Sequence, residues 1–192
     1  MPEIKTIISL FAVLLSIVGY IPYLRDTVKG KTKPHVYSWF IWTLLTGIVY
    51  GLQVGSGAGV GSWVTLAVTI IGFVVFLFGM YNGEKDITAT DSVFFILSLV
   101  ALFLWLIAKQ PILSVILVSL IDMLGFAPTI RKSWNKPYSE TLFTYELGAF
   151  RHGLSFFALQ NYNIVTWLYP ITWALANALF SGMLILRRRQ LR

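Results

Sequence analysis

Residues 19–25 read GYIPYLR and residues 125–131 read GFAPTIR, so the first stretch recurs in altered form 106 positions later. The same shift pairs the YSW of residues 37–39 with the FTY of residues 143–145, and Gly47 with Gly153. Similarity at one fixed shift is typical of a chain built from repeated units. These stretches therefore predict that the chain has two related halves.

The composition restricts the class of protein that these halves can form. The chain has 192 residues, of which 57% are hydrophobic and 12% charged, whereas a soluble domain is about 45–50% apolar and about 25% charged. A soluble fold of this size cannot hide so much apolar surface, and a disordered chain would be far more polar. The chain contains no cysteine, which excludes disulfides and thiolate chemistry. We expect a membrane protein.

Apolar runs between helix breakers predict an all-α membrane protein with seven transmembrane helices. A span needs about 20 apolar residues, and seven such spans leave no room for a soluble domain. Glu3, Lys5 and the lack of a small-residue cleavage site favour a retained first span over a cleaved signal. The predicted spans are Ile4–Tyr23, Val36–Val54, Gly61–Tyr81, Ser92–Ala108, Pro111–Ile130, Leu142–Leu159 and Ile164–Leu186.

The positive charges predict how these spans are oriented. Of the basic residues in the connections and near the ends of the spans, only Lys5 and Lys109 fall on the side of the N-terminus, whereas twelve fall on the other side. By the positive-inside rule, we expect the N-terminus outside and the C-terminus in the cytoplasm, in a bacterial inner (plasma) membrane. The net charge of +7 then needs no nucleic-acid partner. The twelve are Arg25, Lys29, Lys31, Lys33, Lys85, Arg131, Lys132, Lys136, Arg187, Arg188, Arg189 and Arg192.

The repeat shift maps the first three spans onto the last three and leaves the fourth, Ser92–Ala108, unpaired. Three spans invert the chain, so a second copy would face the opposite way without one extra span. With that span, the two copies run in the same direction, as parallel repeats about an axis along the membrane normal. We therefore predict a first three-helix bundle over residues 1–83, a linker helix over 84–109 and a second bundle over 110–192.

This 3+1+3 layout resembles the SWEET and PQ-loop transporter superfamily, with Pro22 and Pro128 at the positions of its signature proline. Tyr23 and Thr129 stand where that signature has glutamine. Asn177, after Ala176, is similar to the asparagine of the family's Pro-Asn pair. The resemblance implies that Asn177 faces a substrate and that the two bundles rock to give alternating access. The departures from the motif leave the substrate open.

Polar residues within apolar spans are costly, at about 2.5–3.5 kcal/mol for a charge at the helix centre, and mark functional sites. Counted at about 1.5 Å per residue from the cytoplasmic ends, those of the second half lie about 10–20 Å deep. We expect a substrate site formed by Asn177, Trp173, Trp42, Glu146 and Arg151, and a proton-coupling site or ion pair formed by Asp122, Glu146 and His152.

Each of these roles has a structural alternative. Arg151 could simply neutralise Asp122 or Glu146, because charges in membranes usually pair with one another. Histidine changes charge in the physiological pH range, but a lone histidine is commonly a satisfied hydrogen-bonding group. Trp42 could stack on a substrate ring or pack. Pro22 and Pro128 are either paired hinges or fixed kinks.

The repeat is asymmetric in charge. At the 106-residue shift, Asp122 matches Ser16, Glu146 matches Phe40, Arg151 matches Leu45 and His152 matches Thr46. We therefore expect the second half either to hold a charged substrate group or to titrate.

The predicted function is transport of a small polar solute, such as a sugar or an amino acid, with proton coupling left open. The alternative is a receptor or scaffold of the same fold that binds a ligand without moving it. No phosphate-binding loop, nucleophile motif or metal-ligand spacing occurs, so we expect no enzyme, cofactor or metal. The expected partners are the substrate and membrane lipid, and self-association into a homo-oligomer is left open.

Overall fold

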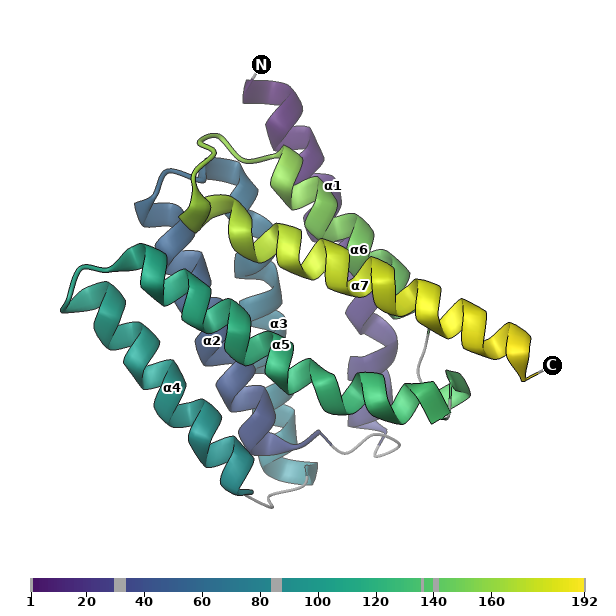
Figure 1. Ribbon diagram of the computed structural model, residues 1–192. Helices are drawn as coiled ribbons and strands as arrows, with labels where there is room; N and C mark the ends of the chain where they lie inside the picture. The colour runs from purple at the N-terminus through teal and green to yellow at the C-terminus, as the bar shows by residue number, and fades with distance from the viewer. Residues whose placement is uncertain (1, 30–33, 84–87, 136, 140–141, 192) are drawn as a thin grey trace.

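A computed structural model describes residues 2–29, 34–83, 88–135, 137–139 and 142–191. Over these residues the chain is helical, which confirms the predicted all-α class. The helices are α1 Pro2–Val28, α2 Val36–Gly55, α3 Trp63–Asn82, α4 Ala89–Leu106, α5 Pro111–Asn135, α6 Leu142–Phe157 and α7 Ile164–Gln190, with two 3-10 turns, η1 Gly59–Ser62 and η2 Pro137–Ser139. Figure 1 shows the helices as one bundle, with α4 at one edge.

Local sequence explains where several helices begin. The His35 imidazole accepts a hydrogen bond from the Ser38 backbone N–H at 3.2 Å and caps α2. Asn163 and Thr166 form a reciprocal capping box at the start of α7, which satisfies backbone donors that have no partner within the helix. Pro111 begins α5, where its missing N–H costs nothing.

The helix contacts follow a repeated pattern. Helix α3 packs against α1 and α2, and α7 packs in the same way against α5 and α6. Between the two sets, α1 contacts α6 and α5 contacts α2. Helix α4 contacts α2 and α5, so it touches both sets.

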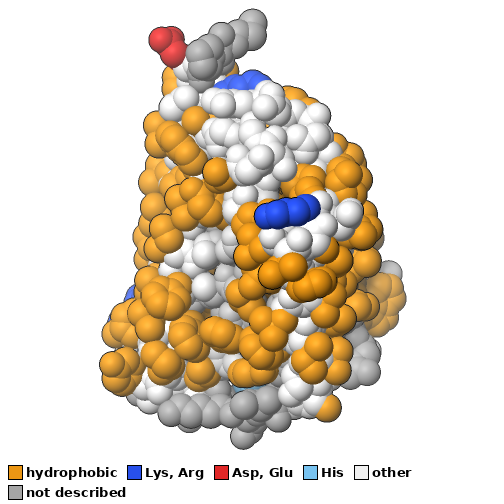
Figure 2. Space-filling model, turned by 90° about the vertical axis from the view of Figure 1, so that its left-hand side faces the viewer, with side chains coloured by type: hydrophobic (Ala, Val, Ile, Leu, Met, Phe, Trp, Pro, Cys, Tyr) orange, Lys and Arg blue, Asp and Glu red, His pale blue; other side chains and the backbone are white. Residues whose placement is uncertain are grey.

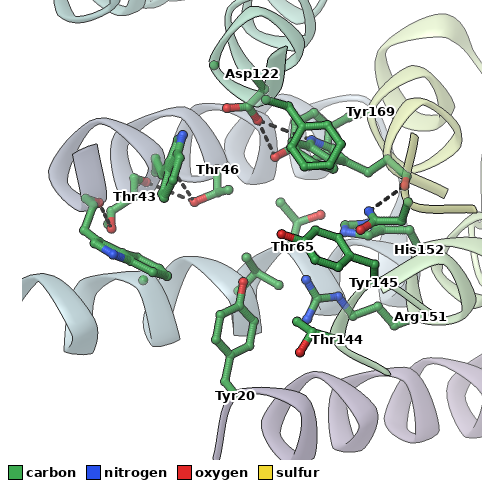
Figure 3. A pocket seen from close by; sticks show the side chains of 18 of the residues that line it. Tyr20, Thr43, Thr46, Thr65, Asp122, Thr144, Tyr145, Arg151, His152 and Tyr169 are labelled. Atoms are coloured by element: carbon green, nitrogen blue, oxygen red, sulfur yellow. Dashed lines mark hydrogen bonds between the residues drawn. The ribbon is translucent and has the colours of Figure 1, made fainter. Parts of the chain in front are cut away.

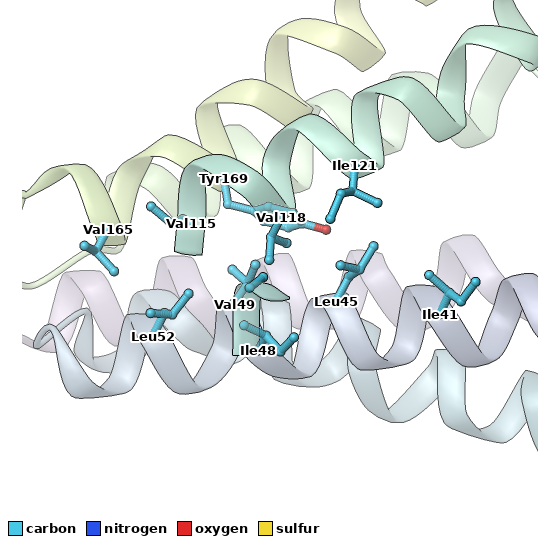
Figure 4. Packing of buried hydrophobic residues seen from close by; sticks show 11 residues of the cluster. Ile41, Leu45, Ile48, Val49, Leu52, Val115, Val118, Ile121, Val165 and Tyr169 are labelled. Atoms are coloured by element: carbon cyan, nitrogen blue, oxygen red, sulfur yellow. The ribbon is translucent and has the colours of Figure 1, made fainter. Parts of the chain in front are cut away.

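The main apolar core lies between α2, α4, α5 and α7, and Figure 4 shows its α2, α5 and α7 residues. Leu45 is fully buried, and Val118 and Ile121 of α5 lie opposite it in Figure 4. The close fit of branched side chains here matters in a membrane, where van der Waals packing rather than water exclusion holds helices together. The core residues are Ile41, Leu45, Ile48, Val49, Leu52, Ala101, Val115, Val118, Ile121, Val165 and Tyr169.

Four helical segments are long and apolar enough to cross a membrane, namely Glu3–Arg25, Val36–Gly55, Gly59–Tyr81 and Ile164–Gln190. The apolar parts of α4 and α5, Ser92–Leu106 and Pro111–Phe126, are shorter. Helix α6 has 16 residues and carries Glu146, Arg151 and His152. Hydrophobic side chains cover most of the face in Figure 2. The chain therefore has the character of an integral membrane protein.

Candidate functional site

A cavity of about 360 Å³ lies among α1, α2, α3, α5, α6 and α7 (Figure 3). This volume is within the range of small-molecule sites, about 300–1,000 Å³. The lining residues are Tyr20, Tyr23, Trp39, Trp42, Thr43, Thr46, Thr65, Val68, Gly72, Asp122, Gly125, Phe126, Thr144, Tyr145, Arg151, His152, Tyr169, Trp173 and Asn177.

Several lining residues come in pairs related by the 106-residue repeat. Tyr20 matches Phe126, Trp39 matches Tyr145 and Thr46 matches His152, and both members of each pair line the cavity. Equivalent positions of the two halves thus face one space. The cavity lies where the repeated sets of helices meet.

Asp122 lies on the α5 side of the cavity and is only 4% exposed. One of its carboxylate oxygens, Oδ2, accepts a hydrogen bond from the Tyr169 hydroxyl at 2.7 Å and another from Trp173 Nε1 at 3.3 Å. Hydrogen bonds to a charged acceptor are stronger than neutral ones. The acid is therefore held by two donors of α7.

Arg151, on α6, is placed differently from Asp122. Its guanidinium carbon lies 5.1 Å from the centre of the Tyr20 ring, a cation–π distance. Its Nε is buried and has no hydrogen-bond partner. Among the described residues, neither Asp122 nor Glu146 forms an ion pair with Arg151, and Asp122 is held by Tyr169 and Trp173. The roles predicted for these charges, as functional groups or as a structural pair, stay predictions.

His152 and Asn177 are two further polar residues of the cavity, and both contact Trp173. The His152 ring stacks on Trp173 with centroids 6.3 Å apart and meets Tyr169 edge-on. Asn177 Nδ2 donates a hydrogen bond to the Trp173 carbonyl at 2.7 Å, which uses one amide donor within α7. Its amide also packs on α6, since a Cβ at Gly148 would come within 2.8 Å of Asn177 Oδ1.

The opposite side of the cavity, from α1 and α2, is aromatic and uncharged. Trp39 lies edge-on to Trp42 at 5.4 Å, and its Nε1 donates a hydrogen bond to the Tyr23 hydroxyl at 3.2 Å. The Thr43 and Thr46 hydroxyls donate to backbone carbonyls of their own helix, at 2.7 and 2.9 Å. Each threonine oxygen can then act only as an acceptor toward the cavity.

Two of the predicted functional positions lie away from this cluster. Glu146 is exposed on α6, beside a shallow surface hollow that also involves Phe150 and Leu175, so the structure does not bring it to the cavity. Pro22 lies inside α1, which continues to Val28. Pro128 lies within α5, and its side chain is not described. Lys31, Lys33, Lys85, Lys136 and Arg192 lie outside the described residues.

Two connections far apart in the sequence, residues 53–62 and 155–166, are held together by hydrogen bonds and close backbone contact, and we call them the clasp. Gln53 Nε2 donates to the Thr166 carbonyl at 3.1 Å, and Asn163 Nδ2 donates to the Ser56 carbonyl at 3.1 Å. The connections also touch through their backbones, since a Cβ at Gly61 would come within 2.7 Å of Leu159 Cα.

The cavity lies on one side of this clasp. On the four helices that adjoin the clasp, the lining residues nearest to it are Thr46, Thr65, His152 and Tyr169, and the others lie farther from it along each helix. Thr144, at the start of α6, lines the cavity and is exposed. The lining therefore stops short of the clasp and, on α6, reaches the surface at the far end of the helix.

Sequence reasoning missed part of the uncharged side, including Tyr20, Thr43 and Thr65, because neutral residues in an apolar span give no charge signal. Tyr20 had one usable signal, its position within the repeated GYIPYLR stretch. Among the residues that the structure describes, no group of three or more His, Asp or Glu side chains could hold a metal ion.

Comparison with protein families, with curated proteins and with solved structures found no match to this chain.

Proposed function

We propose that this protein is an integral membrane transporter that moves a small polar solute by alternating access, in the manner of the SWEET and PQ-loop superfamily that it resembles. The cavity between the two related sets of helices carries this proposal. A substrate path between two such bundles is lined by equivalent residues of both. The pairs Tyr20/Phe126, Trp39/Tyr145 and Thr46/His152 fit that requirement.

In this proposal, α1–α3 and α5–α7 are two parallel three-helix bundles, and α4 is the linker between them. In the first set, α3 packs against α1 and α2, and in the second set α7 packs against α5 and α6. This repeated pattern of contacts supports the arrangement. The presence of both an α1–α6 contact and an α2–α5 contact also supports the arrangement. A two-fold relation between the bundles would map α1 onto α5 and α6 onto α2, and would thus turn one contact into the other. Helix α4 touches α2 and α5, as a linker between bundles would.

The clasp gives the proposal a direction. The N-terminus of α1 reaches the clasp, where Ser9 Oγ donates to the Val60 carbonyl and Lys5 Nζ to the Leu159 carbonyl. The described basic residues at the end of α1, Arg25 and Lys29, and those in the last turn of α7, Arg187–Arg189, lie at the ends of these helices that are far from the clasp. We assign the structure to a state that is closed outside and open to the cytoplasm, with the N-terminus outside. Asp122 and His152 stay our prediction for proton coupling.

A receptor of the same fold could keep the clasp closed permanently, whereas a transporter must open it. The test places one cysteine in the cavity, Thr43→Cys, in this cysteine-free chain. A membrane-impermeant maleimide is then applied to either face of sealed vesicles. Ser56→Cys in the clasp and Lys29→Cys at the end of α1 are the single-sided controls.

Alternating access predicts that Thr43→Cys is labelled from both faces, whereas each control is labelled from one face only, and from opposite faces. Labelling of Thr43→Cys from the Lys29 face alone would support the receptor. If both controls are labelled from the same face, the proposed orientation and the parallel repeat are wrong.

A further inference from the structure

Arg151 places a positive charge in the cavity, and binding of a neutral polar substrate would not require that charge. Its guanidinium lies against the Tyr20 ring, and its buried Nε has no hydrogen-bond partner among the described residues. A charge near the middle of a membrane is unfavourable unless it has a partner. The ring offsets part of this cost. Nothing in the described chain supplies a counter-charge to Arg151.

Asp122, the acidic residue of the same cavity, does have hydrogen-bond partners. Asp122 receives hydrogen bonds from both Tyr169 and Trp173, and Figure 3 shows it on the other side of the cavity from Arg151. An anionic ligand group is repelled by Asp122 and attracted by Arg151. The two charges therefore orient such a ligand, with its anionic end at Arg151.

The remaining lining indicates the rest of the ligand. Eight aromatic side chains line the cavity, namely Tyr20, Tyr23, Trp39, Trp42, Phe126, Tyr145, Tyr169 and Trp173. Flat rings bind planar or apolar groups by stacking and burial. The threonines of α2 add only acceptor oxygens toward the cavity, and acceptors do not bind a second anionic group.

We infer that the cavity binds a small organic monocarboxylate with a planar or apolar body, and that Arg151 binds its carboxylate. A guanidinium presents a planar fork that matches a carboxylate with two hydrogen bonds. One arginine facing one carboxylate leaves no excess charge, whereas a dianion such as phosphate would leave one beside Asp122. This inference rests on the proposed function only in taking the cavity as the substrate site.

The test measures the binding of three matched probes to the purified full-length protein by isothermal titration calorimetry. Phenylacetate carries the carboxylate, phenylacetamide is its neutral isostere and phenethylammonium carries the opposite charge. Inorganic phosphate is the fourth probe. We expect phenylacetate to bind about ten-fold or more tighter than phenylacetamide, because hydrogen bonds to a charged group contribute about 1.5–3 kcal/mol.

Variants assign this preference to one side chain. Arg151→Gln is expected to bring the ratio of the two affinities to about two-fold or less, and Arg151→Lys to an intermediate ratio, because lysine keeps the charge without the fork. The matched control is Arg189→Gln, an exposed arginine in the last turn of α7, which is expected to keep the wild-type ratio. Gel filtration and circular dichroism check that each variant is folded.

The inference is overturned if the wild type binds phenylacetamide, phenethylammonium or phosphate as tightly as phenylacetate, or binds no carboxylate. It is also overturned if a folded Arg151→Gln keeps the full preference. Should that variant not fold, the wild-type ratio and Arg151→Lys still decide the question. Labelling of Thr43→Cys from both faces together with no carboxylate preference would refute the substrate class and leave the transporter proposal standing.

Discussion

Two of the helix contacts between the halves of this molecule, α2 with α5 and α1 with α6, are related by the 106-residue shift but differ in chemistry. Leu45 of α2 is fully buried in the apolar core beside α5. Its counterpart on α6 is Arg151, whose guanidinium faces Tyr20 of α1. The α2–α5 contact is a packed apolar core, which we call the apolar seam, whereas the α1–α6 contact borders the cavity. The comparison indicates that two positions related by the 106-residue shift, Leu45 and Arg151, can lie at equivalent helix contacts and differ in charge.

The largest effect is expected from placing an arginine in the apolar seam between α2 and α5, at the position equivalent to Arg151. Leu45→Arg places a charge in the core between α2 and α5, with no acid beside it among the described core residues. We expect a loss of stability of about 3 kcal/mol or more, and little folded protein. Leu45→Met, a volume-conserving change, is the control and should cost less than about 1.5 kcal/mol. Purified yield and the thermal unfolding midpoint are the measurements. A folded Leu45→Arg protein would show that the seam is not a packed core.

The reverse exchange, Arg151→Leu, should behave in the opposite way. Replacing a poorly compensated buried charge with an apolar residue is often neutral or stabilising. We expect an unchanged or higher thermal midpoint together with loss of the roughly ten-fold preference for phenylacetate over phenylacetamide. Thermal unfolding and calorimetry on the same sample measure both. Strong destabilisation would mean that Arg151 holds α1 and α6 together and that its role is structural.

A smaller effect is expected at Asp122, the acidic residue of the cavity. Asp122→Ala leaves the Tyr169 hydroxyl and the Trp173 indole N–H without an acceptor, and should cost about 1–2 kcal/mol. Asp122→Asn keeps an oxygen acceptor, so its thermal midpoint should lie closer to that of the wild type. Equal destabilisation by the two variants would indicate that the charge of Asp122, rather than its hydrogen bonds, stabilises α5 against α7.

The smallest effect is expected on the uncharged side. Thr46→Val removes a hydroxyl that bonds within α2, so stability should change by less than about 1 kcal/mol. Binding of phenylacetate should fall by less than about three-fold, because no charge is involved. A loss as large as that of Arg151→Gln would show that the two sides of the cavity contribute equally to recognition.

Much of the helical framework could be predicted from the sequence, because apolar runs and breakers fix where helices begin and end. The expected spans at Val36–Val54 and Ile164–Leu186 lie within α2 and α7. The end of α1 was less well predicted, since Pro22 does not end the helix and α1 continues to Val28. Proline near a helix end removes one hydrogen bond but does not force termination.

The site could be predicted only in part, because span depth says nothing of which way a side chain faces. Asp122, Arg151, His152, Trp173 and Asn177 all line the cavity, as does Trp42. Glu146, at a similar depth, is exposed on another face of α6. The clasp could not be foreseen, because it depends on hydrogen bonds between connections about 100 residues apart in the chain, such as Gln53 to Thr166.

Opening of the clasp is the central claim, and a distance measured across it tests that claim most directly. Val54 and Tyr162 are exposed, at 52% each, on the two connections of the clasp, and both can carry spin labels as cysteine variants. Pulsed electron paramagnetic resonance in liposomes, with and without phenylacetate, then gives the distribution of distances between them. Alternating access predicts a short and a longer population whose ratio changes with phenylacetate. A single short distance under both conditions would contradict it.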